Sequence, residues 1–257
     1  MLKFLLDILF PVFCLGCRTE GLWLCQNCQK QIRFNRHFIC PICKKNSDFG
    51  QTCQKCRLEN SLDGCLVALS YEQELVRELI RVFKYKYILD LKEILSGFLI
   101  DFLKKVQNKK IGFQYIIKKD GSAEAVAGQV KVPEIFLKAD QAILIPVPLH
   151  KKRLADRGYN QSDLLAEDLS KSFGFELNKN LLVRHKNTRA QARLKKEERL
   201  VNVVDAFECP RPEAVKGLNI ILVDDIYTTG ATIGECAKVL KEAGAGEVWG
   251  IVLARGQ

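Results

Sequence analysis

Two neighbouring carboxylates follow an apolar run near the end of the chain. The run covers 220–223 (Ile-Ile-Leu-Val), and Asp224 and Asp225 come directly after it. Four β-forming apolar residues in a row are typical of a strand buried on both faces of a parallel sheet. Open α/β sheets bind ligands at the carboxyl ends of their strands. Two carboxylates at that place could accept hydrogen bonds from two adjacent hydroxyl groups of a sugar.

A loop rich in hydroxyl groups begins two residues after this acidic pair, and a helical pattern follows the loop. Backbone N–H groups at a helix N-terminus favour a phosphate, and a glycine lets the backbone approach that phosphate closely. The acidic pair and the loop together predict a site for a ribose 5-phosphate. The alternative is an ordinary strand-to-helix turn with a solvated acidic pair, and a Walker loop is excluded because no lysine follows the glycine. The loop residues are Thr228, Thr229, Gly230, Ala231 and Thr232.

A second group of polar residues follows an expected strand over 142–147. The turn at 146–148 (Pro-Val-Pro) is stiffened by the fixed φ of proline. Cations after a strand end, beside a glycine and a helix start, suit a pyrophosphate, because arginine binds phosphate oxygens through a bidentate fork. A solvated basic loop is the alternative. The cationic residues are His150, Lys151, Lys152, Arg153 and Arg157.

Eight of the eleven cysteines form four CxxC pairs between residues 14 and 56. Two CxxC turns can bring four thiolates to one tetrahedral zinc ion, so four pairs predict two structural Zn²⁺ ions. Redox-active pairs or buried free thiols are the alternatives, and the density of pairs argues against both. A sequential pairing gives one ion Cys14, Cys17, Cys25 and Cys28, and gives the other Cys40, Cys43, Cys53 and Cys56. The spacing also allows a cross-braced pairing, first with third and second with fourth.

Helical and extended patterns alternate after the cysteine-rich segment, which predicts an α/β fold with a parallel sheet and right-handed crossovers. We expect two regions. Residues 1–60 would hold a short amphipathic helix and the zinc module, and 61–257 an α/β domain with an irregular insertion over 107–141. The expected helices cover 72–83, 89–106 and 161–173, and a further helix follows the 228–232 loop and ends at about residue 243. The expected strands cover 65–70, 142–147, 181–183, 219–223 and 248–253.

The composition is that of a globular chain with a basic excess. Of the 257 residues, 47% are hydrophobic and 27% charged, and the formal net charge is +10. Two Zn²⁺ ions bound to eight thiolates would lower this charge to about +6. The segment 184–199 carries seven Lys or Arg against two Glu, which fits either a solvated face or a mobile basic loop near a phosphate-rich ligand. We find no run long enough to span a membrane and no signal-peptide pattern, so we expect a cytoplasmic protein.

The stretch 219–232 resembles the phosphoribosyl pyrophosphate (PRPP) motif of type I phosphoribosyltransferases. That motif has a hydrophobic strand, two acidic residues, two spacers and a Thr/Ser–Gly loop. The resemblance implies that Asp224 and Asp225 form the catalytic acidic pair, which accepts hydrogen bonds from the 2- and 3-hydroxyls of the ribose. It implies that the loop 228–232 holds the 5-phosphate. It also implies that Mg²⁺ bridges pyrophosphate and ribose oxygens, since this hard ion keeps several waters and needs few protein ligands.

The motifs and their order resemble those of the ComF family. Members of this family are competence-associated, phosphoribosyltransferase-like proteins with an N-terminal double zinc ribbon. The resemblance covers nearly the whole chain except 107–141, which carries no family motif. It implies a type I phosphoribosyltransferase-like parallel sheet flanked by helices. The motifs are the doubled cysteine pairs, PVPLHKKRLADRGYNQ at 146–161, NTRAQARLKKEERLVNVVDAF at 187–207 and VDDIYTTGAT at 223–232.

The same resemblance implies further roles for basic residues. Arg153 and Arg157 would face the pyrophosphate. A flexible loop within 184–199 would close over the ligand and exclude water. The loop residues in question are Arg189, Gln191 and Arg193.

Three functions fit these observations. The first, which we favour, is a competence protein that binds PRPP or a nucleotide and handles incoming single-stranded DNA in the cytoplasm, beside a DNA-translocating helicase. The second is an active PRPP-dependent transferase of nucleotide salvage. The third is a PRPP or nucleotide sensor whose zinc module docks a partner. Single-strand binding combines a basic groove with stacking aromatic rings, and the candidates are Tyr159, Phe34 and Phe38, although such rings commonly pack in a core.

Overall fold

The computed structural model describes residues 11–85, 90–108, 114–117, 123–126, 132–188 and 202–256. The amphipathic helix expected near the N-terminus and the loop residues Arg189, Gln191 and Arg193 lie outside these ranges.

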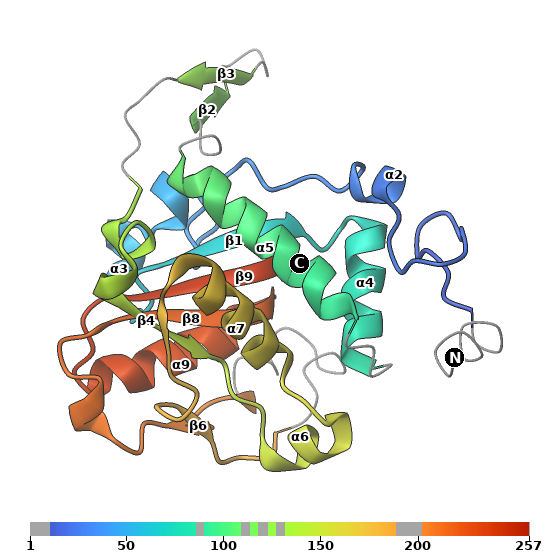
Figure 1. The fold of residues 1–257 in the computed structure, drawn as a ribbon. Coiled ribbons are helices and arrows are strands. Elements are labelled where there is room, and N and C mark those ends of the chain that lie inside the picture. Colours follow the sequence, from blue (N-terminus) through green and yellow to red (C-terminus); the bar gives the residue numbers. More distant parts are fainter. Residues whose placement is uncertain are drawn as a thin grey trace.

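A parallel sheet forms the centre of the fold (Figure 1), and in the described part of the chain it has five strands in the order β1-β9-β8-β4-β5. Its neighbouring strands all run parallel, so the expected α/β class is confirmed. The carboxyl ends of the strands therefore meet at one edge. The strands are β1 (Gly64–Ser70), β4 (Ala142–Pro146), β5 (Glu176–Leu177), β8 (Asn219–Tyr227) and β9 (Val248–Arg255).

The structure differs from the expected strands in several places, and β5 was not expected. β8 continues to Tyr227, so the acidic pair lies inside the strand, and Asp224 is paired with Val252 of β9. The segment expected as a strand at 181–183 lies outside the main sheet, where β6 (Val183–Arg184) pairs antiparallel with β7 (Phe207–Glu208). Within 107–141, β2 (Gln114–Ile117) and β3 (Ala123–Val126) form an antiparallel hairpin apart from the main sheet.

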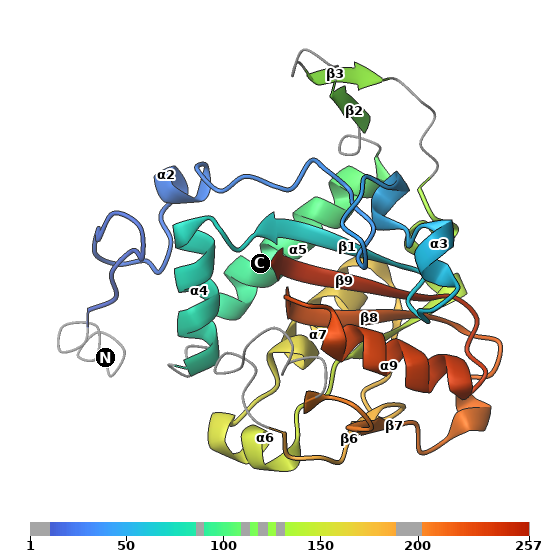
Figure 2. The same cartoon turned by 180° about the vertical axis from the view of Figure 1, so that it is seen from behind.

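Helices cover both faces of the sheet. Figure 1 shows α5 and α7 in front of it, and Figure 2, from behind, shows α9 on the opposite face. α6 was not expected, and it carries the basic residues that follow β4. The longer helices are α4 (Glu74–Tyr85), α5 (Leu91–Gln107), α6 (Lys151–Arg157), α7 (Gln161–Phe173) and α9 (Ala231–Glu242). The short ones are α2 (Gln26–Gln29), α3 (Gln54–Arg57), η1 (Asp48–Gly50), η2 (Glu134–Phe136), η3 (Ala139–Gln141) and η5 (Pro212–Ala214).

Alternate residues of β8 enter two separate cores. Ile221 and Val223 lie in the core with α4, α5 and α7, whereas Ile220 and Leu222 lie in the core with α9. The strand is apolar on both faces because both faces are covered, as the unbroken apolar run predicted. Among the described residues, no helix combines the length and the hydropathy that a bilayer span requires.

The cysteine-rich segment lies along the free edge of β1. Phe34 forms an antiparallel bridge with Leu69, and Gln51 forms another with Gly64. The amide of Asn35 donates to the carbonyl of Ala68 at 2.8 Å. This segment therefore satisfies backbone groups that an open sheet edge would leave unpaired. The boundary expected near residue 60 stays a prediction.

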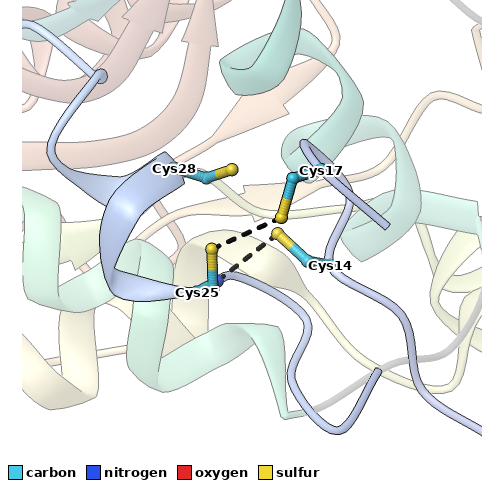
Figure 3. Close-up of side chains that lie close together, drawn as sticks. All are labelled: Cys14, Cys17, Cys25 and Cys28. Atoms are coloured by element: carbon cyan, nitrogen blue, oxygen red, sulfur yellow. Dashed lines mark hydrogen bonds between the residues drawn. The ribbon is translucent and has the colours of Figure 1, made fainter. Parts of the chain in front are cut away.

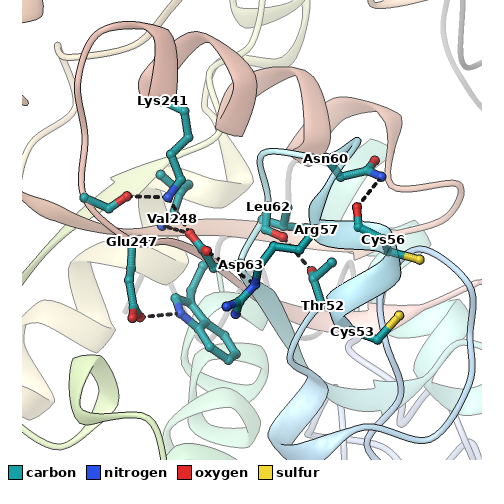
Figure 4. A network of polar contacts seen from close by, with 12 residues as sticks. Thr52, Cys53, Cys56, Arg57, Asn60, Leu62, Asp63, Lys241, Glu247 and Val248 are labelled. Carbon is teal, nitrogen blue, oxygen red and sulfur yellow. Dashed lines mark hydrogen bonds and ion pairs between the residues drawn. The ribbon is translucent and has the colours of Figure 1, made fainter.

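Asp63 joins the end of this segment to β9 and α9 (Figure 4). Its Oδ2 accepts a hydrogen bond from the amide of Val248 at 2.8 Å and pairs with Nζ of Lys241 at 2.7 Å. Nearby, Thr52 donates to the carbonyl of Leu62. These contacts fix the start of β9 and the end of α9 against the cysteine-rich segment, at the opposite end of the sheet from the acidic pair.

Candidate functional site

The two carboxylates of the acidic pair occupy different surroundings. Asp225 is buried, with 6% of its surface exposed, and its Oδ1 lies 2.8 Å from Nζ of Lys84. Asp224 is partly exposed, and its Oδ1 accepts hydrogen bonds from Oγ of Ser162 and from the amide of Asp225, both at 2.9 Å. Lys84 and Ser162 thus hold the pair in place.

Burial and the neighbouring carboxylate of Asp225 raise the pKa of Asp224 to about 7. Lys84 and the hydrogen bond from Ser162 act in the opposite direction. Two carboxylates side by side resist ionising together, and the low dielectric strengthens that effect. The protonation of Asp224 therefore changes near neutral pH.

Lys84 and Ser162 are site residues that the sequence did not reveal. Lys84 lies near the end of α4, far from the acidic pair in sequence, and no local signal marks it. Ser162 follows Asn160, which caps α7 by accepting a hydrogen bond from the amide of Ser162 and which donates to the carbonyl of Val147 at 3.0 Å. The Gly-Tyr-Asn-Gln sequence at 158–161 therefore fixes the start of α7 and, through it, Ser162.

The loop at 228–232 forms the N-terminal end of α9, as its sequence predicted. Gly230 has a φ of 82°, and a Cβ at this position would overlap the hydroxyl of Tyr227. Glycine is therefore required both by the backbone conformation and by the close approach of Tyr227. The hydroxyl of Thr229 accepts a hydrogen bond from the amide of Ala231 at 3.3 Å.

The loop that leads from β4 to the basic residues starts beside the end of β8. Pro146 is paired with Val223 in the sheet, and the amide of Val147 donates to the carbonyl of Val223 at 2.9 Å. The loop that follows β4 and the end of β8 are therefore neighbours. His150 caps α6, where its Nδ1 accepts a hydrogen bond from the amide of Lys152.

Two arginines bind the same residue at this edge. Arg153 donates to the carbonyl of Thr188 and Arg184 donates to its hydroxyl, each at 2.5 Å. Arg157 instead donates to Oε1 of Gln161 at 2.8 Å. The structure thus brings Arg153 to Arg184, a residue of the basic run 184–199. Arg157 contacts the first residue of α7, and its role at a pyrophosphate stays a prediction.

Arg184 is a buried cation without a carboxylate partner among the described residues. Only 6% of its surface is exposed, its guanidinium lies 5.1 Å from the ring centroid of Phe207, and its Nε has no hydrogen-bond partner. Burial and the charge of Arg153 lower the pKa of Arg184 to about 10. A buried charge is costly unless it is paired, so this position suits an anionic ligand.

The eight paired cysteines form two quartets in the sequential arrangement. In each quartet the four sulfur atoms lie within 4.8 Å of one another. Figure 3 shows the first quartet, where the Sγ atoms of Cys17 and Cys25 are 3.6 Å apart. In the second, the Sγ atoms of Cys43 and Cys53 are 3.7 Å apart. Four clustered thiols are the ligand set of structural zinc, so the quartets fit two Zn²⁺ ions.

The aromatic rings proposed for base stacking take part in packing. The rings of Phe34 and Phe98 lie 6.2 Å apart, and those of Phe38 and Phe49 lie 5.1 Å apart. Tyr159 packs on Phe83 and donates its hydroxyl to the carbonyl of that residue. These contacts account for the three rings without a nucleic acid.

Known proteins resemble this chain over most of its length. Residues 5–57 match the double zinc ribbon domain family. Competence protein ComFC of Bacillus subtilis is 30% identical over 233 residues, which cover 86% of this chain and 79% of that protein. Competence protein F of Haemophilus influenzae is 29% identical over 253 residues, which cover 95% of this chain and 98% of that protein. The DNA utilization protein YhgH of Escherichia coli strain K12 is 36% identical over 108 residues, which cover 41% of this chain and 47% of that protein. The chain therefore belongs to the ComF family of competence proteins.

Proposed function

We propose that this protein binds PRPP, or a related ribose 5-phosphate ligand, together with Mg²⁺, and that it takes part in DNA uptake by handling single-stranded DNA in the cytoplasm. The observation that carries the ligand proposal is the register of β4 and β8. It sets the end of β8, which carries Asp224 and Asp225, beside the loop that leads from β4 to the cations. Acceptors for hydroxyls, a phosphate loop and paired arginines are the groups that a pyrophosphorylated ribose needs.

Each part of such a ligand has a matching group. The ribose hydroxyls would donate to Asp224 and Asp225, and the 5-phosphate would accept hydrogen bonds from the 228–232 loop at the N-terminus of α9. The pyrophosphate would lie toward Arg153 and Arg184, where a buried guanidinium has no carboxylate partner in the described part of the chain.

The carboxylate oxygens of the acidic pair are hard donors that suit Mg²⁺. When bound, the ion would neutralise pyrophosphate charge, with most of its ligands supplied by the PRPP and water. The protein's own task would be to position the ribose between Asp224, Asp225 and the phosphate loop.

The role in DNA uptake is supported by family membership and by the names of the relatives, two of which are competence proteins and one a DNA utilization protein. A basic surface suits the DNA backbone, and a competence helicase is the partner that we propose for it. Because the rings of Tyr159, Phe34 and Phe38 take part in packing, DNA binding would depend mainly on phosphate contacts. It should therefore weaken steeply as the salt concentration rises.

Calorimetry with PRPP and Mg²⁺ tests the ligand proposal. The wild-type chain should bind, and the double variant Asp224→Asn/Asp225→Asn should bind at least about tenfold more weakly, because neutral amides accept the ribose hydroxyls less strongly. Asp140→Asn is the matched control, since Asp140 is exposed and lies next to the start of β4, at the other end of the sheet. Equal binding by the wild type and the double variant would refute the proposal.

A PRPP-dependent transferase of nucleotide salvage is the second candidate. The pairing of Arg153 and Arg184 favours it, because two cations at one place could stabilise a departing pyrophosphate. Release of pyrophosphate from PRPP should then require an added acceptor such as a nucleobase or ammonia. Absence of release with every acceptor, in a chain that binds PRPP, would leave binding as the function.

A further inference from the structure

A pocket of about 300 Å³ lies between the cysteine-rich segment and the C-terminal ends of β1 and β9. The cysteine-rich segment contributes Asn35, Phe38 and Lys44 to its wall, and the sheet contributes Val67 and Arg255. The acidic pair and the arginines of the candidate ribose site do not line it. The volume is at the lower end of the range for small-molecule sites, so it suits a molecule of one or two rings.

Arg255 provides a cation in this wall that lacks an anionic partner among the described residues. Its guanidinium lies 4.7 Å from the ring centroid of Tyr227. Its Nε and Nη2 atoms are buried without a hydrogen-bond partner, and no described carboxylate lies within 4.0 Å of it. A guanidinium removed from water in this way is stabilised when a carboxylate comes near it, because a buried charge is costly unless it is paired.

The rest of the lining combines weak positive charge with apolar surface. Lys44 contributes an ammonium group, His37 contributes an imidazole ring, and Glu72 contributes one carboxylate. Lys44 and Arg255 exceed Glu72 by one positive charge. Phe38 and Val67 offer apolar surface. This combination favours a singly charged anion with a flat apolar body over a multiply charged phosphate, which needs more donors.

The pocket adjoins the phosphate loop through Tyr227. The amide of Gly256, another lining residue, donates to the carbonyl of Tyr227 at 2.9 Å. Tyr227 directly precedes Thr228, and its ring lies under the guanidinium of Arg255. A molecule in the pocket would therefore lie beside the ribose site without occupying it.

We propose that this pocket binds a small aromatic or heteroaromatic carboxylate, with the carboxylate on Arg255 and the ring against the apolar wall. The site goes beyond the proposed function, since its ligand needs neither a ribose nor a phosphate. Its position beside Tyr227 makes it suited to a second ligand that is present together with PRPP.

Fluorine NMR of 4-fluorobenzoate with the zinc-loaded full chain tests this proposal. The signal should broaden on binding, and 4-fluorobenzamide, a neutral match in size, should bind about tenfold more weakly because the charge-assisted hydrogen bonds are lost. Arg255→Gln should weaken fluorobenzoate binding to a similar degree. Arg211→Gln is the matched control, since Arg211 is exposed and lies on a different surface pocket.

Two further variants keep the outcome decisive. Arg255→Lys retains the charge and should bind measurably if Arg255→Gln fails to fold. Asp224→Asn/Asp225→Asn should bind fluorobenzoate as the wild type does, so failure of the ribose proposal would not affect this result. Equal binding of benzamide and benzoate, unchanged binding by Arg255→Gln, or complete displacement by inorganic phosphate would each overturn the proposal.

Discussion

The hydroxyl of Tyr227 donates a hydrogen bond to the carbonyl of Pro41 at 3.1 Å. Pro41 directly follows Cys40 of the second cysteine quartet, and Tyr227 directly precedes the phosphate loop. Tyr227 is buried, and burial raises the pKa of its phenol above the usual range, so the hydroxyl remains a donor. This single contact joins a zinc ligand loop to the proposed phosphate site.

Replacing Tyr227 with Phe should weaken both parts of this connection. The change leaves the carbonyl of Pro41 without its donor, so the free energy of unfolding should fall by about 1–2 kcal/mol. Affinity for ribose 5-phosphate should fall as well. Tyr71→Phe is the control, since the hydroxyl of Tyr71 has no hydrogen-bond partner among the described residues. Unchanged denaturation midpoints and unchanged affinity would show that the contact has no role.

Removing the first cysteine quartet should leave one zinc ion per chain. In the structure each quartet brings its own four thiols together, so serine at Cys14, Cys17, Cys25 and Cys28 leaves the second quartet complete. Zinc content measured after dialysis should fall from two to one per chain. A cross-braced arrangement would split both sites, and no tightly bound zinc would then remain.

The second quartet should matter more for the ribose site than the first. Its segment bridges β1 and reaches Tyr227, so Cys40→Ser should reduce ribose 5-phosphate affinity more than Cys14→Ser does. Calorimetry on both variants, each with its zinc content measured, provides the comparison. Equal affinities of the two variants for ribose 5-phosphate would show that the second quartet has no special role in ligand binding.

The prediction of the fold from sequence succeeded where burial is uniform. The expected strands at 65–70 and 219–223 are found because both faces of the sheet are covered and an unbroken apolar run is sufficient to mark them. The extension of β8 to Tyr227 could not be predicted in the same way. Aspartate disfavours strands, and the pairing with β9 that overrides this preference is a long-range contact.

The site was only partly predictable, for a related physical reason. Asp224 and the 228–232 loop are local in sequence, and their spacing predicts a strand, a loop and a helix. Lys84 reaches Asp225 from a helix more than a hundred residues away, which no local pattern encodes. Arg184 belongs to a basic run that resembles a solvated face, and its burial depends on the packing against Phe207.

Affinity for ribose 5-phosphate should rise as the pH rises through about 7. The protonated carboxyl of Asp224 accepts hydroxyl hydrogen bonds less well than the carboxylate, and its pKa is raised to about 7. The phosphate of the ligand also titrates near pH 6, so the comparison with Asp224→Asn is needed. The variant should show a smaller rise, and an identical pH profile would contradict the assignment.

The same pKa shift should act on stability with the opposite sign. The unfolded chain ionises Asp224 near pH 4, whereas the folded chain does so near 7. Between these values the unfolded state binds fewer protons, so this residue lowers the free energy of unfolding as the pH rises, and its effect is constant above 7. Denaturation at pH 5 and pH 8 should show that Asp224→Asn gains stability relative to the wild type at the higher pH. A constant difference between the two proteins would refute the shift.

Arg184→Met should separate stability from ligand binding. The buried guanidinium has no described carboxylate partner, so an apolar side chain of similar length should leave the free energy of unfolding unchanged or raise it. PRPP affinity should fall at least about tenfold, since a charge-assisted contact to the pyrophosphate is lost. Affinity for ribose 5-phosphate, which lacks the pyrophosphate, should stay the same. Equal losses for both ligands would place Arg184 outside the pyrophosphate site.

A crystal structure of the zinc-loaded chain with PRPP and Mg²⁺ shows directly whether the ligand occupies the proposed ribose site. We expect the ribose 2- and 3-hydroxyls within hydrogen-bond distance of Asp224 and Asp225. We expect the 5-phosphate on the amides of 228–232 and the pyrophosphate near Arg153 and Arg184. Density for the ligand elsewhere, with Asp225 still paired to Lys84 and not to the ribose, would contradict the proposed function.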